Sequence, residues 1–481
     1  MEVCVPSATI DVSKITDEGD VTRFHIRLLV MTSMLVFLDG YDITAISFAA
    51  PELAKAWGMV DHSAFGPVFG ASLVGMLVGA PTFGYFGDRY GRKVAIVTSC
   101  IIIGVFTLAI TLATSVIHLM ILRLITGIGM GGLLPNASAL NAEYAPRRYR
   151  ATMIIIMYIG TALGGAVPGP VAAALVPLYG WQVLFLIGGL LPLVGAIMAY
   201  MQLPESVKYL VLKGGQDDAV ARLINSISQR ERVSSPYSFV VGTSSDATVA
   251  TPSLLFKSGL KIATPLLWLL FFTNLMGYFF LLNWTPLLLV GANIPIAKAA
   301  LALSIFQIGG IFGGLCVMRP MDRWGVLPII VLFIFAVPII GSIGFVGATG
   351  SEPLLMALIF LGGFCTLGIQ LGLNAMSAMI YPTAVRASGA GWALGIGRIG
   401  SVVGPLVGGW LIAANHPVQI LYLFASAPFL VGALAGIALG VVSKVKFGGD
   451  LLTAADRAAG KPSTQAIVNA IPMDRHRRSG T

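Results

Sequence analysis

Charged residues are scarce in this sequence. Of its 481 residues only 11% are Asp, Glu, Lys or Arg, whereas about a quarter of an ordinary globular protein is charged. Hydrophobic residues make up 56% of the chain. Such a composition leaves more apolar surface than water can solvate, so an ordinary soluble domain is excluded and a membrane protein is indicated.

Motifs for metal, disulfide or nucleotide chemistry are also missing. The four cysteines lie far apart without CxxC spacing, and three of them, Cys100, Cys316 and Cys365, fall in apolar runs where packing explains them better than ligation. The five histidines are dispersed, and neither a Walker phosphate loop nor an HExxH motif occurs. We therefore expect no cofactor and no enzymatic activity.

Apolar stretches of about twenty residues recur between Leu28 and Val442. Each can cross a hydrocarbon core of roughly 30 Å as a helix that rises about 1.5 Å per residue. Lipid offers the backbone no hydrogen-bond partner, so a spanning chain must be helical or a closed barrel, and continuous runs of this length favour helices. The sequence predicts an all-α integral membrane protein with transmembrane helices at residues 28–49, 65–86, 94–114, 118–140, 151–174, 181–203, 264–290, 298–318, 327–347, 354–380, 387–412 and 418–443.

A long polar stretch divides these twelve helices into six and six. Its Ser/Thr-rich part, from Ser234 to Thr251, is typical of a flexible linker. The polar start of the chain lacks the apolar core and cleavage site of a signal peptide. The predicted segments are a cytoplasmic N-terminal segment at 1–27, a six-helix bundle at 28–203, a central cytoplasmic loop at 204–262, a second six-helix bundle at 263–443 and a cytoplasmic tail at 444–481.

The basic residues sort by side of the membrane. With both termini inside the cell, 26 of the 30 Lys and Arg residues fall in the predicted cytoplasmic segments. Only Lys55 and Lys298 lie outside, while Arg123 and Arg398 lie within helices. Because positive charge is retained on the cytoplasmic side, the net charge of +9 reports orientation and not a nucleic-acid partner.

The two halves of the chain repeat one another. Asp88-Arg89 after helix 2 has an echo in Asp322-Arg323 after helix 8, at an offset of 234 residues. Arg150 before helix 5 has an echo in Arg386 before helix 11, at an offset of 236 residues. A shared offset near half the chain indicates a duplicated six-helix unit.

These motifs resemble a known family. The stretch Gly87–Lys93 is similar to the signature between helices 2 and 3 of the major facilitator superfamily, and Pro204–Ser206 is similar to the segment that closes the first half in related branches. The run Asp39-Gly40-Tyr41-Asp42 in helix 1 resembles the aromatic acid:proton symporter branch, as does helix 4 from Arg123 to Asn136. The resemblance implies two pseudo-symmetric bundles that rock around a central site lined by helices 1, 4, 7 and 10. It also implies import of a hydroxybenzoate-like carboxylate with protons.

Asp39 and Asp42 are the candidates for proton coupling. They lie three residues apart on one helix, hence about one turn apart on a similar face. An ionised carboxylate near the membrane centre costs about 2.5–3.5 kcal/mol, so such residues are rarely incidental. The alternative is that both carboxylates pair permanently with cations and hold helices together.

Arg123 lies at a depth from which it can reach Asp42. Asp42 lies about 21 Å from the inner end of helix 1, and Arg123 lies about 7 Å below the outer end of helix 4. Our hypothesis is that Arg123 pairs with Asp42 when the site is empty and is shared with the substrate carboxylate when the acid is protonated. A permanent structural ion pair is the alternative.

Further candidate substrate contacts are polar groups inside the membrane. Arg398 lies near mid-membrane in helix 11 and is a second candidate anchor for a carboxylate, although an internal pair explains it nearly as well. No acidic residue occurs in the predicted helices of the second half, so its counter-charge must come from elsewhere. The remaining candidates, each of which could instead serve packing or helix contacts, are Asn136, Asn274, Tyr278, Asn283, Gln370 and Asn374.

A gate at the cytoplasmic side is the last predicted site. By the resemblance, Asp88, Arg89 and Arg92 form ion pairs that break and re-form between states, and Glu143 contributes to the same gate. Their counterparts in the second half are Asp322, Arg323 and Arg386. Retention of positive charge on the inside explains the basic residues equally well, but it does not explain Asp88.

The sequence leaves other functions open. An exporter or antiporter of drugs or metabolites on the same scaffold is the main alternative, followed by a porter for a sugar-like solute and by a sensor that binds without moving its ligand. For the leading interpretation the partners are an aromatic acid, protons and the lipid bilayer. We expect a monomer in the plasma membrane, the inner membrane of a bacterium, driven by the proton gradient.

Overall fold

Twelve membrane-spanning segments make up most of the protein. The computed structural model describes residues 8–59, 61–146, 148–214, 217–227, 237–240, 255–256, 260–349, 351–381 and 386–447. Twelve spans in this part are long and apolar enough to cross a membrane, which confirms the predicted all-α architecture. Their helices are α2 (Arg23–Ala56), α3 (Phe65–Tyr90), α4 (Arg92–Ile110), α5 (Val116–Tyr144), α6 (Arg150–Ala166), α7 (Pro168–Tyr179), α8 (Gln182–Gln202), α11 (Leu260–Gly291), α12 (Ile296–Trp324), α13 (Leu327–Thr349), α14 (Glu352–Ile380), α15 (Arg386–Ala413) and α16 (Val418–Phe447).

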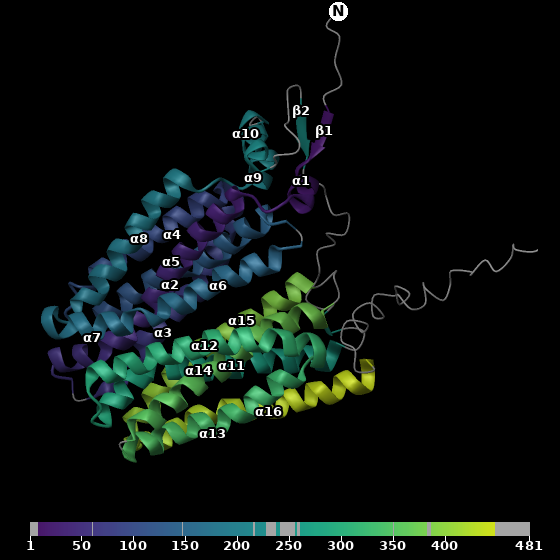
Figure 1. The fold of residues 1–481 in the computed structure, drawn as a ribbon. Helices are drawn as coiled ribbons and strands as arrows, with labels where there is room; N and C mark the ends of the chain where they lie inside the picture. The colour runs from purple at the N-terminus through teal and green to yellow at the C-terminus, as the bar shows by residue number, and fades with distance from the viewer. Residues whose placement is uncertain are drawn as a thin grey trace, which may run out of the picture.

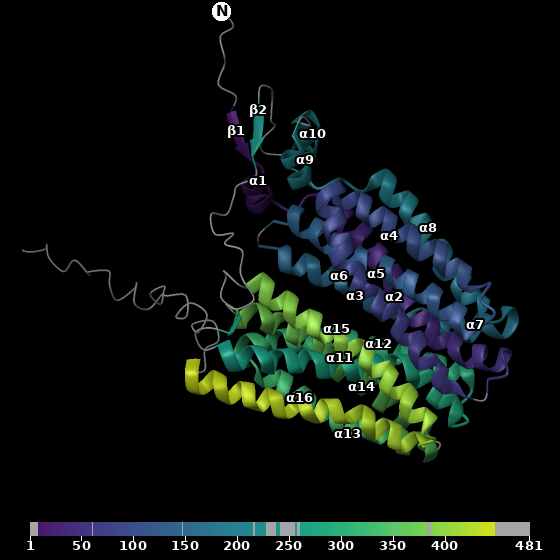
Figure 2. The ribbon, with the colours of Figure 1, turned by 180° about the vertical axis from the view of Figure 1, so that it is seen from behind.

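The helices form two bundles with the same internal pairing. In the N-terminal bundle, α2 to α8, helix α3 packs on α5, α2 on α6 and α4 on α8. In the C-terminal bundle, α11 to α16, the corresponding pairs are α12 on α14, α11 on α15 and α13 on α16. Figures 1 and 2 show the two bundles side by side, the first in purple to blue and the second in green to yellow. The duplication predicted from the offset motifs is therefore present in three dimensions.

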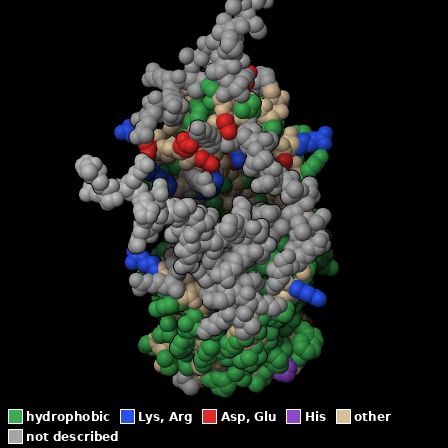
Figure 3. All heavy atoms as spheres, turned by 90° about the vertical axis from the view of Figure 1, so that its right-hand side faces the viewer, with side chains coloured by type: hydrophobic (Ala, Val, Ile, Leu, Met, Phe, Trp, Pro, Cys, Tyr) green, Lys and Arg blue, Asp and Glu red, His purple; other side chains and the backbone are tan. Residues whose placement is uncertain are grey.

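The first membrane helix begins at the same end of the molecule at which the last one finishes (Figure 1). Helix α2 starts and α16 finishes there, and the short elements outside the membrane lie at the same end (Figure 1). It is the predicted cytoplasmic end, viewed in Figure 3, where basic and acidic side chains gather above a largely hydrophobic lower part. We call the opposite end the outer end.

The bundles contact each other through their outer halves. Helix α15 packs on α3 and on the short helix η1 (His62–Ala64), α12 packs on α6 and α7, and α11 packs on α2. At the outer end the backbones nearly touch, since a Cβ atom added to Gly66 would lie 3.2 Å from the Cα atom of Gly409. Among the described residues no ion pair joins the cytoplasmic halves. The conformation is closed at the outer end.

Helix 5 differs from its prediction as one continuous helix. It is two helices, α6 and α7, with Val167 between them. Pro168 and Pro170 lack the N–H groups that would bond to the carbonyl groups of Gly164 and Ala166, so the regular ladder is interrupted there. Two prolines in an apolar run mark the break, and the hydropathy of the run hides it.

The segments outside the membrane contain more structure than predicted. Strand β1 (Ala8–Asp11) pairs in parallel with β2 (Tyr237–Val240), which lies within the stretch predicted as flexible linker. Helices α1 (Val12–Glu18), α9 (Val207–Lys213) and α10 (Asp217–Ile227) accompany them. The flexible-linker prediction is wrong for residues 237–240, while the rest of Ser234–Thr251 lies outside the described residues.

Ion pairs fasten the N-terminal segment to the N-terminal bundle. Asp17 pairs with Arg150, and Asp20 pairs with Arg148 at 2.8 Å. His25, at the start of α2, lies 3.0 Å from the carbonyl oxygen of Tyr144 through its Nε2 atom. The segment is thereby held over the α5–α6 connection.

Helix α3 offers a test of the close packing inside a bundle. A Cβ atom at Gly75 would lie 2.2 Å from the carbonyl oxygen of Leu124, whereas one at Gly84 of the same helix meets nothing within 4 Å. We expect Gly75→Ala to force α3 away from α5, at a cost of about 1–3 kcal/mol, and to lower the melting temperature in detergent by several degrees. Gly84→Ala is the control, and equal melting temperatures for the two variants would contradict the packing.

Candidate functional site

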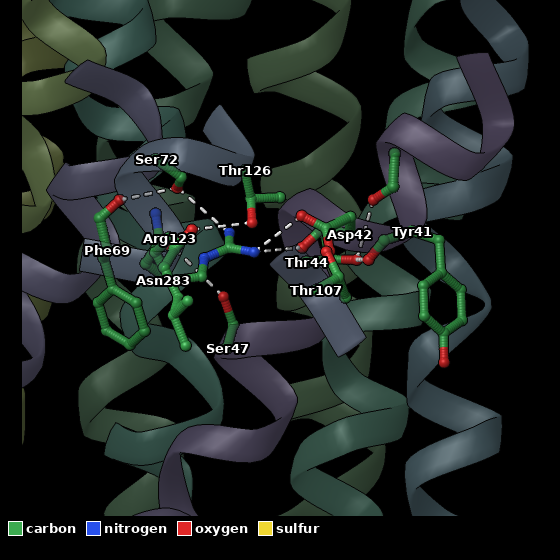
Figure 4. A network of polar contacts seen from close by, with 12 residues as sticks. Tyr41, Asp42, Thr44, Ser47, Phe69, Ser72, Thr107, Arg123, Thr126 and Asn283 are labelled. Carbon is green, nitrogen blue, oxygen red and sulfur yellow. Dashed lines mark hydrogen bonds and ion pairs between the residues drawn. The ribbon is translucent and has the colours of Figure 1, made fainter. Parts of the chain in front are cut away.

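A buried ion pair joins α2 to α5. The Nη1 atom of Arg123 lies 2.8 Å from Oδ2 of Asp42, and neither side chain is exposed at all. The sequence-based depth estimate allowed this contact, and the structure contains it. Thr107 of α4 donates a hydrogen bond of 2.7 Å to the other carboxylate oxygen of Asp42, and Arg123 donates a further one of 3.2 Å to Ser72 of α3. Figure 4 shows the guanidinium lying between Asp42 and Ser72.

The pair is thus fixed by four helices of one bundle. A carboxylate that accepts from a guanidinium and a hydroxyl is well compensated for the loss of water. Arg123 is occupied on the same side by the backbone carbonyl of Asp42, at 3.3 Å. In this conformation Arg123 is closed off from solvent, and both of its Nη atoms donate to protein groups, whereas its Nε atom has no hydrogen-bond partner among the described residues.

Asp39, one turn along α2, is in a different environment. It is 1% exposed, and neither of its carboxylate oxygens has a hydrogen-bond partner among the described residues. Its charged neighbours are Arg398 of the other bundle and Asp42, and Cys100 of α4 lies nearby. The two acids that the sequence treats alike are therefore distinct, because Asp42 is locked within its bundle and Asp39 is not.

Arg398 supplies positive charge from the C-terminal bundle. It lies on α15, is half-buried, and interacts electrostatically with Asp39 and with Tyr158 of α6. Its hydrogen-bond partner in the described part of the chain is the sulfur of Met76, at 3.6 Å. A thioether is a weak acceptor, so the guanidinium retains donors for a carboxylate. Asp39 is the acidic residue whose charge acts on Arg398, although no hydrogen bond joins the two side chains.

Amide side chains form a ladder in the C-terminal bundle. Asn274 of α11 donates to Gln370 of α14 at 2.9 Å, and Gln370 donates to Asn374 at 3.4 Å. The side-chain oxygen of Asn274, the buried member of the ladder, has no hydrogen-bond partner in the described part of the chain. Tyr278 donates to Gln307 of α12 at 3.1 Å. The structure thus brings together four of the predicted contacts and adds Gln307.

Two predicted contacts lie apart from this group. Asn283 is buried at the seam between the bundles, where it accepts a hydrogen bond of 3.3 Å from Ser47 of α2 (Figure 4). Asn136 lies 13 residues beyond Arg123 on α5, about 20 Å further toward the cytoplasmic end. Its amide donates to the carbonyl groups of Phe83 and Gly132, so it joins helices near the gate.

The predicted gate residues form contacts within the N-terminal bundle. Asp88 pairs with Arg92, which also donates to Oδ1 of Asn136 at 3.0 Å. Arg89 donates to the hydroxyl of Tyr85 at 3.0 Å, and Glu143 accepts from the hydroxyl of Ser206. The side chains of Asp322, Arg323 and Arg386 lie outside the described part of the structure.

Glu205 connects the segment after α8 to the start of α4, near the predicted gate residues. The sequence did not indicate this contact. Its carboxylate accepts from the backbone N–H of Lys93 at 3.1 Å and from that of Ser206 at 2.8 Å. It therefore satisfies a donor in the first turn of α4, where the helix dipole also favours a negative charge. The Pro204–Ser206 motif carries the signal, although its role becomes visible only through this contact.

The remaining residues missed by sequence reasoning are neutral. Ser72 and Thr107 complete the Asp42–Arg123 network, and Tyr158 interacts electrostatically with Arg398. Such residues are common in membrane helices, so their types alone predict nothing. Only the positions of neighbouring helices distinguish them.

The family follows from comparison with known proteins. The sequence model of the Major Facilitator Superfamily matches residues 32–349, well over half of the chain. The chain belongs to the major facilitator superfamily. Among its relatives the 4-hydroxybenzoate transporter PcaK of Pseudomonas aeruginosa is 34% identical, over 91% of this chain and 98% of that protein. The gallate transporter of Pseudomonas putida is 34% identical, over 90% of this chain and 96% of that protein.

These relatives place the chain in the aromatic acid transporter family of the superfamily, and it is an integral membrane transporter and not an enzyme. A solved structure titled as the inward open conformation of the xylose transporter XylE from Escherichia coli has a TM-score of 0.67. It covers 86% of this chain and 95% of its own at 17% identity, so the likeness confirms the fold alone.

The buried pair can be tested through stability. Removing one partner of a fully buried ion pair costs about 3–5 kcal/mol, because the other charge is left uncompensated. We expect Asp42→Asn and Arg123→Gln each to lower the melting temperature markedly, and the double variant to recover part of the loss.

The exposed pair of Lys298 and Glu352 is the control, since its side chains are 46% and 51% exposed. Glu352→Gln should change the stability by less than about 1 kcal/mol. Single variants of the buried pair that melt like the wild type would contradict a structural role for it.

Proposed function

We propose that this protein imports a small aromatic carboxylate of the hydroxybenzoate kind together with protons, by alternating access. The observation that carries the proposal is the buried Asp39 carboxylate, which lacks a hydrogen-bond partner among the described residues and interacts with Arg398 across the two bundles. The names of the relatives, transporters of 4-hydroxybenzoate and of gallate, support the substrate class.

The coupling follows from charge balance in an apolar site. In the empty site the Asp39 carboxylate balances Arg398. A substrate carboxylate that binds the guanidinium, by two parallel hydrogen bonds, takes over that role. Asp39 is then a buried anion without a cation, and such a group is neutralised by a proton. Substrate and proton therefore enter together and leave together.

The amide ladder suits the other end of such a substrate. Gln370 is half-buried and Asn374 is exposed, so neither side chain is sealed inside its bundle. A phenolic hydroxyl both donates and accepts, and amide groups can meet it in either role. Tyr278 adds a ring that is stacked on Phe306 at 5.9 Å between centroids. These groups favour a hydroxylated ring over an unsubstituted one.

We further propose the plasma membrane, the inner membrane of a bacterium, as the location, with both termini in the cytoplasm. The distribution of Lys and Arg supports this orientation. One chain carries both bundles and the site between them, which supports a monomer as the transporting unit.

Asp39→Asn tests the proton role. A neutral amide mimics the protonated acid permanently, so we expect concentrative uptake driven by a pH gradient to fall at least about tenfold, while exchange of labelled for unlabelled substrate persists. The measurement is uptake and counterflow in proteoliposomes. If this variant still accumulates the substrate fully in response to the pH gradient, Asp39 does not carry the coupled proton.

Counterflow against a panel of acids tests the substrate and direction. We expect exchange with hydroxybenzoates, gentisate and protocatechuate, weaker exchange with benzoate, and a rise in KM of about tenfold or more for Arg398→Gln. Exchange with non-acidic solutes alone would exclude the proposed substrate class and favour a sugar-like porter. An acidic exterior that depletes the substrate instead of accumulating it would favour an exporter or antiporter.

A further inference from the structure

The break between α6 and α7 leaves a backbone carbonyl that the other bundle satisfies. In a regular helix the carbonyl oxygen of Ala166 accepts from the N–H four residues on, but that residue is Pro170 and has no N–H. The hydroxyl of Ser304, on α12 of the C-terminal bundle, donates to this oxygen at 2.6 Å. Both Ser304 and Ala166 are buried.

The two preceding carbonyl groups, those of Gly164 and Gly165, accept hydrogen bonds from within the N-terminal bundle. Pro168 deprives the carbonyl oxygen of Gly164 of its usual donor, yet the N–H of Val167 supplies a replacement at 3.3 Å. Thr44 of α2 donates to the carbonyl oxygen of Gly165 at 3.1 Å. The hydrogen bond to Ala166 is therefore special among these three, because it comes from the body that moves during alternating access.

The approach of Ser304 depends on the residue between the prolines. A Cβ atom at Gly169 would lie 2.0 Å from the Ser304 hydroxyl oxygen and 2.8 Å from the carbonyl oxygen of Ala300. Only a glycine lets α12 lie this close to α7. The sequence Pro168-Gly169-Pro170 thus both exposes an acceptor and makes room for its donor.

We infer that the Ser304 hydroxyl and the Ala166 carbonyl form a latch that holds the outer end of the transporter closed. When α12 moves away from α6 and α7, the acceptor loses its donor, and a buried unpaired carbonyl is costly until water reaches it. The latch therefore favours the outer-closed state. The inference concerns conformation and holds for any substrate.

Ser304→Ala tests the latch in the absence of substrate. The reporter is Ser47→Cys in a chain freed of its native cysteines, because Ser47 is fully buried at the seam between the bundles. Its rate of modification by a membrane-impermeant maleimide added outside right-side-out vesicles rises with the outer-open population. We expect Ser304→Ala to raise this rate about three- to tenfold, the loss expected for one hydrogen bond.

Ser342→Ala is the matched control, since Ser342 donates a hydrogen bond of the same 2.6 Å to the carbonyl of Pro338 within α13 alone. It should leave the rate unchanged. An unchanged rate in Ser304→Ala, or an equal rise in both variants, would overturn the latch.

Pro170→Ala identifies the acceptor. It restores an N–H that can bond to Ala166 within the helix, so in this background Ser304→Ala should change the rate by less than about twofold. The same three- to tenfold rise in both backgrounds would show that the Ala166 carbonyl is not the partner that matters.

Gly169→Ala is an independent variant that keeps both prolines. The added methyl group occupies the place of the Ser304 hydroxyl, so the modification rate should again rise. No rise would mean that the close approach of α12 does not control the outer end.

Discussion

A charge placed among apolar helices must be balanced by another part of the protein, and the transporter solves this problem in two ways. Asp42 and Arg123 balance each other inside one bundle, with hydroxyl groups completing the set. Asp39 and Arg398 lie on different bundles, so their balance depends on how the bundles sit. The first arrangement lies within one bundle, and the second lies across the two bundles.

Most of the fold was predictable because lipid offers the backbone no hydrogen-bond partners. A backbone without water must be helical, so twelve apolar runs became twelve spans, and the duplicated motifs became matching helix pairs. The β1–β2 pairing was beyond prediction, because its strands are short, lie in polar segments and are far apart in the chain. The break at Val167 was missed since an apolar run hides the prolines within it.

The candidate site was predicted as a set of residues but not as an arrangement. Spacing on α2 cannot separate Asp39 from Asp42, because their difference arises from Thr107 and Arg123 on other helices. The sequence offered Asn136 as a candidate substrate contact or a helix contact, and in the structure it accepts a hydrogen bond from Arg92. Residue type predicts which groups carry chemistry, and neighbouring helices decide what each of them does.

The parallel pairing of β1 with β2 also constrains how the chain is made. Ala8 lies opposite Tyr237, so the second strand is synthesised some 230 residues after the first. At about 5–20 residues per second, β2 follows β1 after on the order of ten seconds or more, an interval in which α2 to α8 are synthesised. The small sheet can therefore form only after the whole N-terminal bundle has been translated.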